Sequence, residues 1–514
     1  MWRGHVRVAT HGKATGLGAA SVSWIPPPSA EQSSFASTLF PQTLAMMGLR
    51  CTSAPAPPFM SPVSAPQQDA VSLLCPPESP WRRAWYPVAD LRDLDPARPT
   101  PFTLLGDDLV LWWEQATQQW RAFADVCPHR LVPLSEGRLN ASGELECPYH
   151  GWSFRGDGHC TAIPQSTSDM ASHPRARCRT YATATGQGLL FVFAGDPADS
   201  ESTPLPLVPA LEESSGPGLR PWLIQDTFRD LPYDALTLLE NVLDVSHVPF
   251  THHGTVGRRE NAGPVELQLL QEDATGFTGQ WEEGPRRGKL GSQSTTFLAP
   301  CLMWHDLTAP AFARILTVVY ATPIRPGACR LFARFPFQFR SPLPAQLLRL
   351  RPVWLQHISN HRVLEDDQLF LHWQERVLAQ RGGGANLSRA CFLPTSADRY
   401  VMALHQWVAE HAGPPFPGCA LPARLDQEVL MERLHSHTNH CHACSGALAG
   451  LRQWRPWIAV VPWLAVLAAA WWRTPWSLGL GMFIALAAAW MEGQLNRWET
   501  QLRQGDGHPP RNRS

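Results

Sequence analysis

The sequence predicts an α+β protein in three parts: an all-β domain, a domain with an antiparallel sheet and long helices, and a C-terminal pair of apolar helices. Short strand-like runs separated by turn residues predict the first part, at residues 81–198. Longer strand patterns followed by helical patterns predict the second, at residues 221–425. Two uncharged runs bordered by Trp predict the third, within residues 456–491.

Length, charge and Cys content limit the class of protein. The chain has 514 residues, more than one hydrophobic core supports, so we expect two or three compact units. Its formal net charge of −1 gives no indication of binding to nucleic acid, and we expect no such partner. Ten of the twelve Cys are scattered along the chain, which is unlike a disulfide scaffold.

Residues 1–70 have the composition of an organellar transit peptide. They are rich in Ser, Thr, Ala and Pro and carry basic residues, but contain only two acids, Glu31 and Asp69. A disordered tail is the alternative interpretation.

Two Cys–His pairs in the first domain predict a metal centre. One residue separates Cys127 from His129, and two separate Cys147 from His150. Such a set suits a [2Fe-2S] cluster with thiolates on one iron and imidazoles on the other. A structural zinc ion is the alternative, but its ligands usually show other spacings. Since both Cys must stay reduced to bind iron, we expect a cytosol-like or stromal compartment.

Strand patterns surround these two loops. Three runs precede the first loop and one buried run follows the second, at residues 102–105, 109–113, 119–123 and 188–194. A Pro-rich linker at residues 199–220 then leads to the second domain.

The second domain carries a candidate iron site. A helical pattern places Asn241, Asp244 and His247 on one face, and Pro249 should end that helix. The break would let the His252 imidazole converge with that of His247. The alternative interpretation is that His247 and His252 are surface residues with ordinary hydrogen-bond partners and bind no metal.

A facial triad that binds non-haem Fe(II) needs one carboxylate besides two His. A later helical pattern, at residues 362–375, offers the adjacent Asp366 and Asp367. We therefore expect this helix to supply the third ligand.

Other patterns complete the second domain. Strand runs at residues 313–322 and 329–335 flank a long turn and predict a hairpin. A helix should begin at residues 395–398, and its apolar stripe belongs to the core: Tyr400, Leu404, Trp407 and Val408.

Residues 426–448 are rich in His and Cys and contain the close pair Cys441 and Cys444. A close dithiol is typical of a redox switch, which is our first interpretation. Zinc binding together with a neighbouring His, and two inert thiols, are the alternatives.

The final apolar runs, residues 457–472 and 476–491, predict a transmembrane hairpin. Each is shorter than the ~20 residues that cross a bilayer comfortably, but neither is charged and Trp lies at both ends. Flanking cations would hold both ends on the membrane face that carries the catalytic domains: Arg452, Arg455, Arg497 and Arg503. A buried soluble helical hairpin is the alternative. A polar tail follows, at residues 492–514.

Several segments carry a family resemblance. The two Cys–His loops resemble those of Rieske-type ring-hydroxylating oxygenases, at residues 127–131, 134–137 and 147–154. The order of all motifs resembles the pheophorbide a oxygenase family of Rieske non-haem iron oxygenases, carried by residues 240–253, 392–398 and 441–444. Related branches include chlorophyllide a oxygenase, a protochlorophyllide-oxidising branch and the Rieske subunit of a chloroplast envelope translocon.

The resemblance implies a role for each site residue. Four residues hold the [2Fe-2S] cluster: Cys127, His129, Cys147 and His150. Three hold the mononuclear Fe(II): His247, His252 and Asp367. Asp367 is preferred to Asp366 because the family places this ligand seven residues before a Gln, here Gln374. Asp244, beside Asn241 in the catalytic site, resembles a carboxylate that bridges subunits of a head-to-tail homotrimer.

The resemblance also implies a helix-grip catalytic domain and a monooxygenase that receives electrons from ferredoxin, since no flavin or nicotinamide domain is recognisable here. The implied reaction uses O2 to oxidise a chlorophyll-derived tetrapyrrole, above all pheophorbide a, with ring opening in chlorophyll breakdown. Oxygenation of chlorophyllide or protochlorophyllide, or redox sensing in a translocon, are the alternatives. The implied location is the chloroplast thylakoid or inner envelope membrane, with the catalytic domains facing the stroma.

Overall fold

The computed structural model describes residues 74–213, 221–282, 293–308, 314–382, 387–472 and 474–506. The expected transit peptide lies outside the described residues, as do parts of the expected linker, membrane turn and tail. The described residues belong to one compact unit, residues 68–514.

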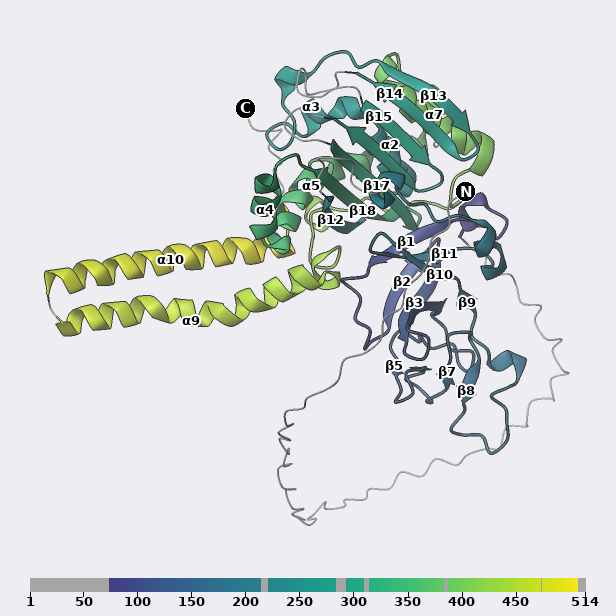
Figure 1. The fold of residues 1–514 in the computed structure, drawn as a ribbon, viewed down its shortest axis with the longest axis horizontal. Coiled ribbons are helices and arrows are strands. Elements are labelled where there is room, and N and C mark those ends of the chain that lie inside the picture. The colour runs from purple at the N-terminus through teal and green to yellow at the C-terminus, as the bar shows by residue number, and fades with distance from the viewer. Residues whose placement is uncertain are drawn as a thin grey trace, which may run out of the picture. The chain divides into compact units, whose positions relative to one another are not determined.

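Three antiparallel sheets form the N-terminal part of the described chain (Figure 1). The first has the order β1-β11-β10: β1 (Trp85–Asp90), β11 (Leu189–Phe193) and β10 (Thr183–Gly186). The second is β2 (Thr100–Leu104), β3 (Asp107–Glu114), β4 (Gln119–Ala124) and β9 (Thr180–Tyr181). The third is β5 (Arg138–Leu139), β6 (Leu145–Glu146), β7 (Ser153–Phe154) and β8 (Cys160–Ala162). The four predicted strand runs correspond to β2, β3, β4 and β11, so these predictions are confirmed.

One antiparallel sheet of seven strands forms the second part. Its order is β12 (Leu223–Leu231), β18 (Ala328–Gln338), β17 (Arg314–Arg325), β16 (Leu302–Leu307), β15 (Gln293–Leu298), β14 (Gly276–Trp281) and β13 (Leu267–Asp273).

The predicted hairpin of this sheet is present, but its turn is shorter than expected. Arg325 pairs with Ala328, so the strands continue through most of the predicted turn. Gly327 has φ = 72°, a backbone conformation that only Gly adopts without strain, and this permits the tight reversal.

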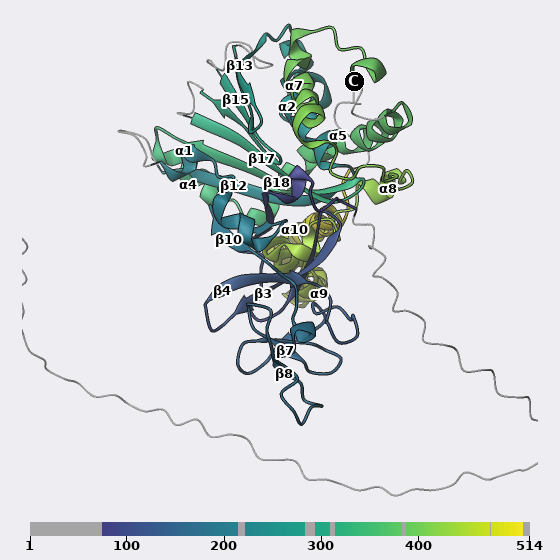
Figure 2. The ribbon, with the colours of Figure 1, turned by 90° about the vertical axis from the view of Figure 1, so that its right-hand side faces the viewer.

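Helices cover one face of the seven-stranded sheet, as Figure 2 shows. The covering helices are α2 (Ala235–Leu243), α5 (Val353–Gln380) and α7 (Arg399–Trp407). Shorter helices lie in the connections: α1 (Pro209–Glu212), α3 (Val248–Thr251), α4 (Pro342–Leu350), α6 (Leu387–Ala390) and α8 (Gln427–Leu430). The predicted apolar stripe is buried, and Thr395 and Asp398 form the capping box before α7, so both predictions are confirmed.

A continuous hydrophobic core joins the N-terminal sheets to the seven-stranded sheet. Strand β17 of the seven-stranded sheet contacts β1 and β2 of the N-terminal sheets, and its central residues are buried on both faces. The Tyr320 hydroxyl donates to the Pro206 carbonyl at 2.8 Å, and the Thr322 hydroxyl donates to the Pro87 carbonyl at 2.7 Å. Because buried polar groups need such partners, these bonds fix how the two parts pack.

Two long apolar helices end the described chain: α9 (His442–Trp472) and α10 (Pro475–Arg503). Both are long and apolar enough to cross a membrane by length and composition. Arg452 and Arg455 of α9 pair with Glu499 of α10 at 3.2 and 3.3 Å. Gly481 lies so close to Ala469 and the Ala465 carbonyl that a side chain would not fit. The two helices therefore pack against each other along the apolar runs as well as at their charged ends.

Candidate metal centres

Two loops with the same backbone form carry the four predicted cluster residues. The amide of Leu131 donates to the Cys127 carbonyl at 2.9 Å, and the amide of Gly151 donates to the Cys147 carbonyl at 3.1 Å. Leu131 and Gly151 both have a positive φ, 57° and 71°, which folds each loop back tightly. Each loop thereby presents one Cys and one His.

The side chains of the two loops meet. The ring centroids of His129 and His150 lie 4.5 Å apart, and the Trp152 ring stacks on His129 at 4.6 Å. The Cys127 and Cys147 thiols are buried, whereas both imidazoles are half-buried. The His129 Nδ1 atom is buried without a hydrogen-bond partner among the described residues. This donor set fits a [2Fe-2S] cluster with its thiolates inward and its imidazoles outward.

The helix before the second centre ends earlier than the sequence predicts. Helix α2 stops at Leu243, and the Asp244 side chain accepts a hydrogen bond from the Ser246 amide at 2.8 Å, which caps a new 3-10 turn. Pro249 lies in the first turn of α3, where its missing N–H costs nothing, so it begins a helix. The prediction of one helix ended by Pro249 is therefore wrong, because a polar side chain competes for the backbone first.

The three predicted iron ligands lie together despite this difference. The ligand atoms of His247, His252 and Asp367 all lie within 4.8 Å of one another. The Nε2 atoms of His247 and His252 are 3.1 Å apart, and Asp367 Oδ2 is 3.3 Å from His252 Nε2. Two imidazole nitrogens and one carboxylate oxygen are the donors of a facial triad, so the set fits mononuclear Fe(II).

Two further contacts hold these imidazoles. Asp366 Oδ2 lies 3.3 Å from His252 Nδ1 and accepts a hydrogen bond from the Thr255 hydroxyl at 2.7 Å. The His247 Nδ1 atom contacts the Asp244 carbonyl. A ligating His usually donates its second N–H to such an oxygen, which fixes its tautomer and orientation. The sequence analysis considered Asp366 only as an alternative iron ligand to Asp367, and it missed the contact of Asp366 with His252. The one sequence feature that could have indicated this contact is the adjacency of the two acids.

The predicted catalytic residues Asn241 and Asp244 lie at the end of α2, and both are half-buried. Asp244 Oδ1 accepts hydrogen bonds from both the amide and the hydroxyl of Ser246. The other oxygen, Oδ2, makes no hydrogen bond within the described part of the chain. Asp244 therefore has acceptor capacity left for another group.

A cavity opens beside the histidine segment. Its volume is about 450 Å³, and its wall includes Ser246, Pro249, Phe250 and Val265. Ser246 directly precedes His247 and Pro249 follows it by two residues, so the cavity lies along the segment that carries this predicted ligand. Its wall is largely apolar, as is usual for pockets that bind organic ligands.

A buried His lies near the triad but has other partners. His305 Nδ1 lies 2.8 Å from the Thr295 hydroxyl, and its Nε2 lies 2.9 Å from the Val242 carbonyl. Burial lowers the pKa of His305 to about 4, so the imidazole stays neutral at physiological pH. Both ring nitrogens are occupied, which makes His305 a support for the end of α2.

A pair of carboxyl groups links α2 to α5. Glu375 Oε1 accepts a hydrogen bond from the Asp234 amide, and Asp234 Oδ1 accepts one from the Gly327 amide, both at 2.6 Å. Burial, followed by the neighbouring Asp234, raises the pKa of Glu375 to about 8, against the opposing charge of Arg376. The two helices that lead to the triad are thus joined by a group that carries a proton at neutral pH.

The predicted dithiol belongs to a larger cluster. Cys441 and Cys444 are buried with His357 of α5 and His437, and the four ligand atoms lie within 4.8 Å of one another. Sequence reasoning named the two Cys and an unspecified neighbouring His. It missed His357, which lies 84 residues before Cys441.

The chain matches two protein-family models and several proteins of known function. The Rieske [2Fe-2S] domain model matches residues 84–181, and the pheophorbide a oxygenase model matches residues 297–385. The chain is 35% identical over 405 residues to chloroplastic pheophorbide a oxygenase of Arabidopsis thaliana, covering 72% of this chain and 73% of that protein. It is 36% identical over 398 residues to the Oryza sativa subsp. japonica enzyme, covering 71% and 73%.

Solved structures share the fold. The structure of Pseudomonas putida CBB5 NdmA with caffeine matches with a TM-score of 0.51 and 22% identity, and covers 64% of this chain and 90% of that one.

Proposed function

We propose that this chain, which belongs to the pheophorbide a oxygenase family of Rieske non-haem iron oxygenases, oxidises a chlorophyll-derived tetrapyrrole, and that this substrate is pheophorbide a. A Rieske monooxygenase of this family takes electrons from ferredoxin and uses O2. The observation that carries the proposal is the convergence of two imidazoles and one carboxylate in a chain that also bears the two Cys–His loops. A pure electron carrier needs no such second set of ligands.

Two separate sets of residues would hold the two metal centres. The cluster would be held by Cys127, His129, Cys147 and His150. The mononuclear iron would be held by His247, His252 and Asp367. When bound, these groups supply one-electron transfer and O2 activation, and the protein's task is to hold them and exclude water.

Side chains around the triad keep the ligands in place. Asp366 accepts from the Thr255 hydroxyl and, in our proposal, also from His252 Nδ1–H, which leaves Nε2 as a lone-pair donor. The Asp244 carbonyl would do the same for His247. The apolar wall of the 450 Å³ cavity, including Pro249 and Phe250, would accept the apolar face of a macrocycle.

Asp244 and Asn241 would serve catalysis from the end of α2. The unused Oδ2 of Asp244 supports a bridge to a cluster His of a neighbouring subunit, in a head-to-tail homotrimer. The Asp244 side chain would accept from the neighbour's imidazole while its backbone carbonyl accepts from His247, which offers a path between the cluster of one subunit and the iron of the next.

The proposed organisation has seven segments. In chain order these are a chloroplast transit peptide, a Rieske domain, a linker, a helix-grip catalytic domain, a His/Cys-rich segment, a transmembrane hairpin and a polar tail: 1–70, 81–198, 199–220, 221–425, 426–448, 456–491 and 492–514. The apolar exposed faces of α9 and α10 support insertion into a membrane. We place that membrane in the chloroplast, thylakoid or inner envelope, with the catalytic domains in the stroma.

The test is incubation of the purified, iron-replete protein with reduced ferredoxin, O2 and a panel of pigments: pheophorbide a, chlorophyllide a and protochlorophyllide. We expect consumption of pheophorbide a and formation of an oxygenated product. Consumption of another pigment instead would reassign the substrate. Failure to consume any pigment, in a preparation with about three irons per chain, would reject the proposal.

A further inference from the structure

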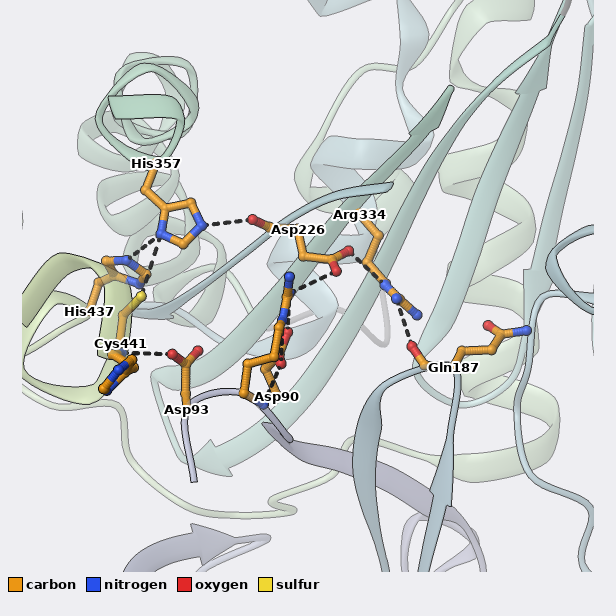
Figure 3. Close-up of polar contacts among 10 residues, drawn as sticks. Asp90, Asp93, Gln187, Asp226, Arg334, His357, His437 and Cys441 are labelled. Atoms are coloured by element: carbon orange, nitrogen blue, oxygen red, sulfur yellow. Dashed lines mark hydrogen bonds and ion pairs between the residues drawn. The ribbon is translucent and has the colours of Figure 1, made fainter. Parts of the chain in front are cut away.

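Four metal-binding side chains meet in a buried cluster away from the iron triad. His357, His437, Cys441 and Cys444 are 6%, 1%, 2% and 1% exposed. His357 Nδ1 lies 3.1 Å from His437 Nε2, 3.5 Å from Cys441 Sγ and 3.4 Å from Cys444 Sγ. Figure 3 shows His357, His437 and Cys441 facing one another.

Hydrogen bonds alone cannot pair all the polar atoms that meet in this cluster. His357 Nε2 lies 2.9 Å from the Asp226 carbonyl, which can only accept, so Nε2 carries the proton and Nδ1 has one lone pair. That lone pair can accept from one neighbour, yet three polar atoms face it at hydrogen-bond distance. A cation between the four atoms would satisfy every one of them.

We propose that His357, His437, Cys441 and Cys444 bind a structural zinc ion. Two sulfurs and two nitrogens in a tetrahedral arrangement are a common zinc ligand set. Bonds of about 2.0–2.3 Å place tetrahedral ligand atoms roughly 3.3–3.8 Å apart, close to the separations seen here. The Asp226 carbonyl acts as the outer partner that orients a ligating imidazole.

Charge and burial agree with this assignment. Two thiolates and two neutral imidazoles balance the charge of Zn²⁺, so the filled site adds no net charge to the interior. Four protein ligands complete the coordination shell, as in a structural site, and all four are buried.

The position of the site indicates its purpose. Cys441 and Cys444 lie at the start of α9, and the His442 amide donates to Asp93 Oδ1 at 2.7 Å. His357 lies on α5 ten residues before Asp367, about 15 Å along the helix. The zinc ion would therefore fasten the base of the apolar helix pair to the helix that carries the proposed iron ligand.

The experiment measures metals in the full-length protein, purified in detergent through a tag without His. We expect about one zinc per chain in addition to about three irons. The double variant Cys441→Ser/Cys444→Ser should fall below about a tenth of a zinc per chain. The matched variant Cys391→Ser/Cys419→Ser, which removes two thiols elsewhere, should retain the zinc.

A second measurement on the unaltered chain covers the case in which the double variant does not fold. Protein produced with Co²⁺ in place of zinc should show the visible bands and thiolate charge-transfer absorption of a tetrahedral Co²⁺ site. Alkylation followed by mass spectrometry should find Cys441 and Cys444 protected until a strong chelator is added. A zinc-free protein with a Cys441–Cys444 disulfide, with freely alkylated thiols, or with a fourth iron in this position would overturn the proposal. None of these outcomes depends on pigment turnover.

Discussion

His252 Nδ1 lies 3.3 Å from Asp366 Oδ2, so the imidazole is held by a carboxylate that is not its proposed co-ligand. Its other nitrogen lies 3.3 Å from Asp367, the next residue on α5. The carboxylates of two adjacent residues, Asp366 and Asp367, therefore face the two ring nitrogens of His252. Asp367 would therefore be the iron ligand, and Asp366 would orient the imidazole.

Asp366→Asn should weaken iron binding without removing a ligand. Loss of the charged acceptor frees the His252 ring to change tautomer or rotate, and loss of an outer-shell partner typically lowers metal affinity about 10–100-fold. Equilibrium dialysis against Fe(II) measures the affinity, with the exposed Asp95→Asn as the control. An affinity equal to that of the unaltered protein would contradict the role given to Asp366.

Asp367→Ala should abolish the mononuclear site. One of three protein ligands is lost, so iron should fall from about three to about two atoms per chain. The EPR signal of the reduced cluster should keep its intensity, since the Cys–His loops lie between strands β4 and β7 and Asp367 lies on helix α5. Retention of the third iron would show that another side chain is the ligand.

His150→Cys should lower the reduction potential of the cluster. A thiolate donates more charge than an imidazole, and fully Cys-ligated clusters lie near about −400 mV, below the Rieske range. A redox titration followed by EPR measures the shift. His159→Cys, outside the two loops, should leave the potential unchanged, and an equal shift in both variants would refute the assignment.

Glu375→Gln should flatten the dependence of stability on pH. The folded-state pKa of Glu375 is raised to about 8, so the folded chain binds a proton that the unfolded chain releases near its ordinary pKa of about 4.3. The free energy of unfolding should therefore decrease as pH rises from about 5 to about 8. Denaturant unfolding at several pH values measures this slope, and an equally steep slope in the Gln variant would contradict it.

The features that the sequence predicted well depend on local chemistry. A [2Fe-2S] cluster demands Cys and His at short spacing, and strands such as β3 and β11 show their apolar runs directly. The capping box of Thr395 and Asp398 is likewise a local pattern. Each separate Cys–His pair, each strand run and the capping box lies within about ten residues of chain.

The features that the sequence did not predict depend on competition or on long-range contacts. The end of α2 is decided by Asp244, whose side chain captures the Ser246 amide before Pro249 is reached. The orienting role of Asp366 follows from how α5 is rotated toward His252. His357 meets His437 only through the packing of α5, 80 residues away in the chain.

We propose that electrons from the Cys–His loops serve oxidation at the His247, His252 and Asp367 site. A single-turnover experiment tests it most directly: chemically reduced protein is mixed with O2 and pheophorbide a, while the EPR signal of the reduced cluster and the pigment are followed together. We predict loss of the signal in step with pigment oxidation in the unaltered protein, and neither change at that rate in Asp367→Ala. Pigment oxidation at an undiminished rate in Asp367→Ala, or a cluster in the unaltered protein that stays reduced while pigment is consumed, would rule out this electron transfer.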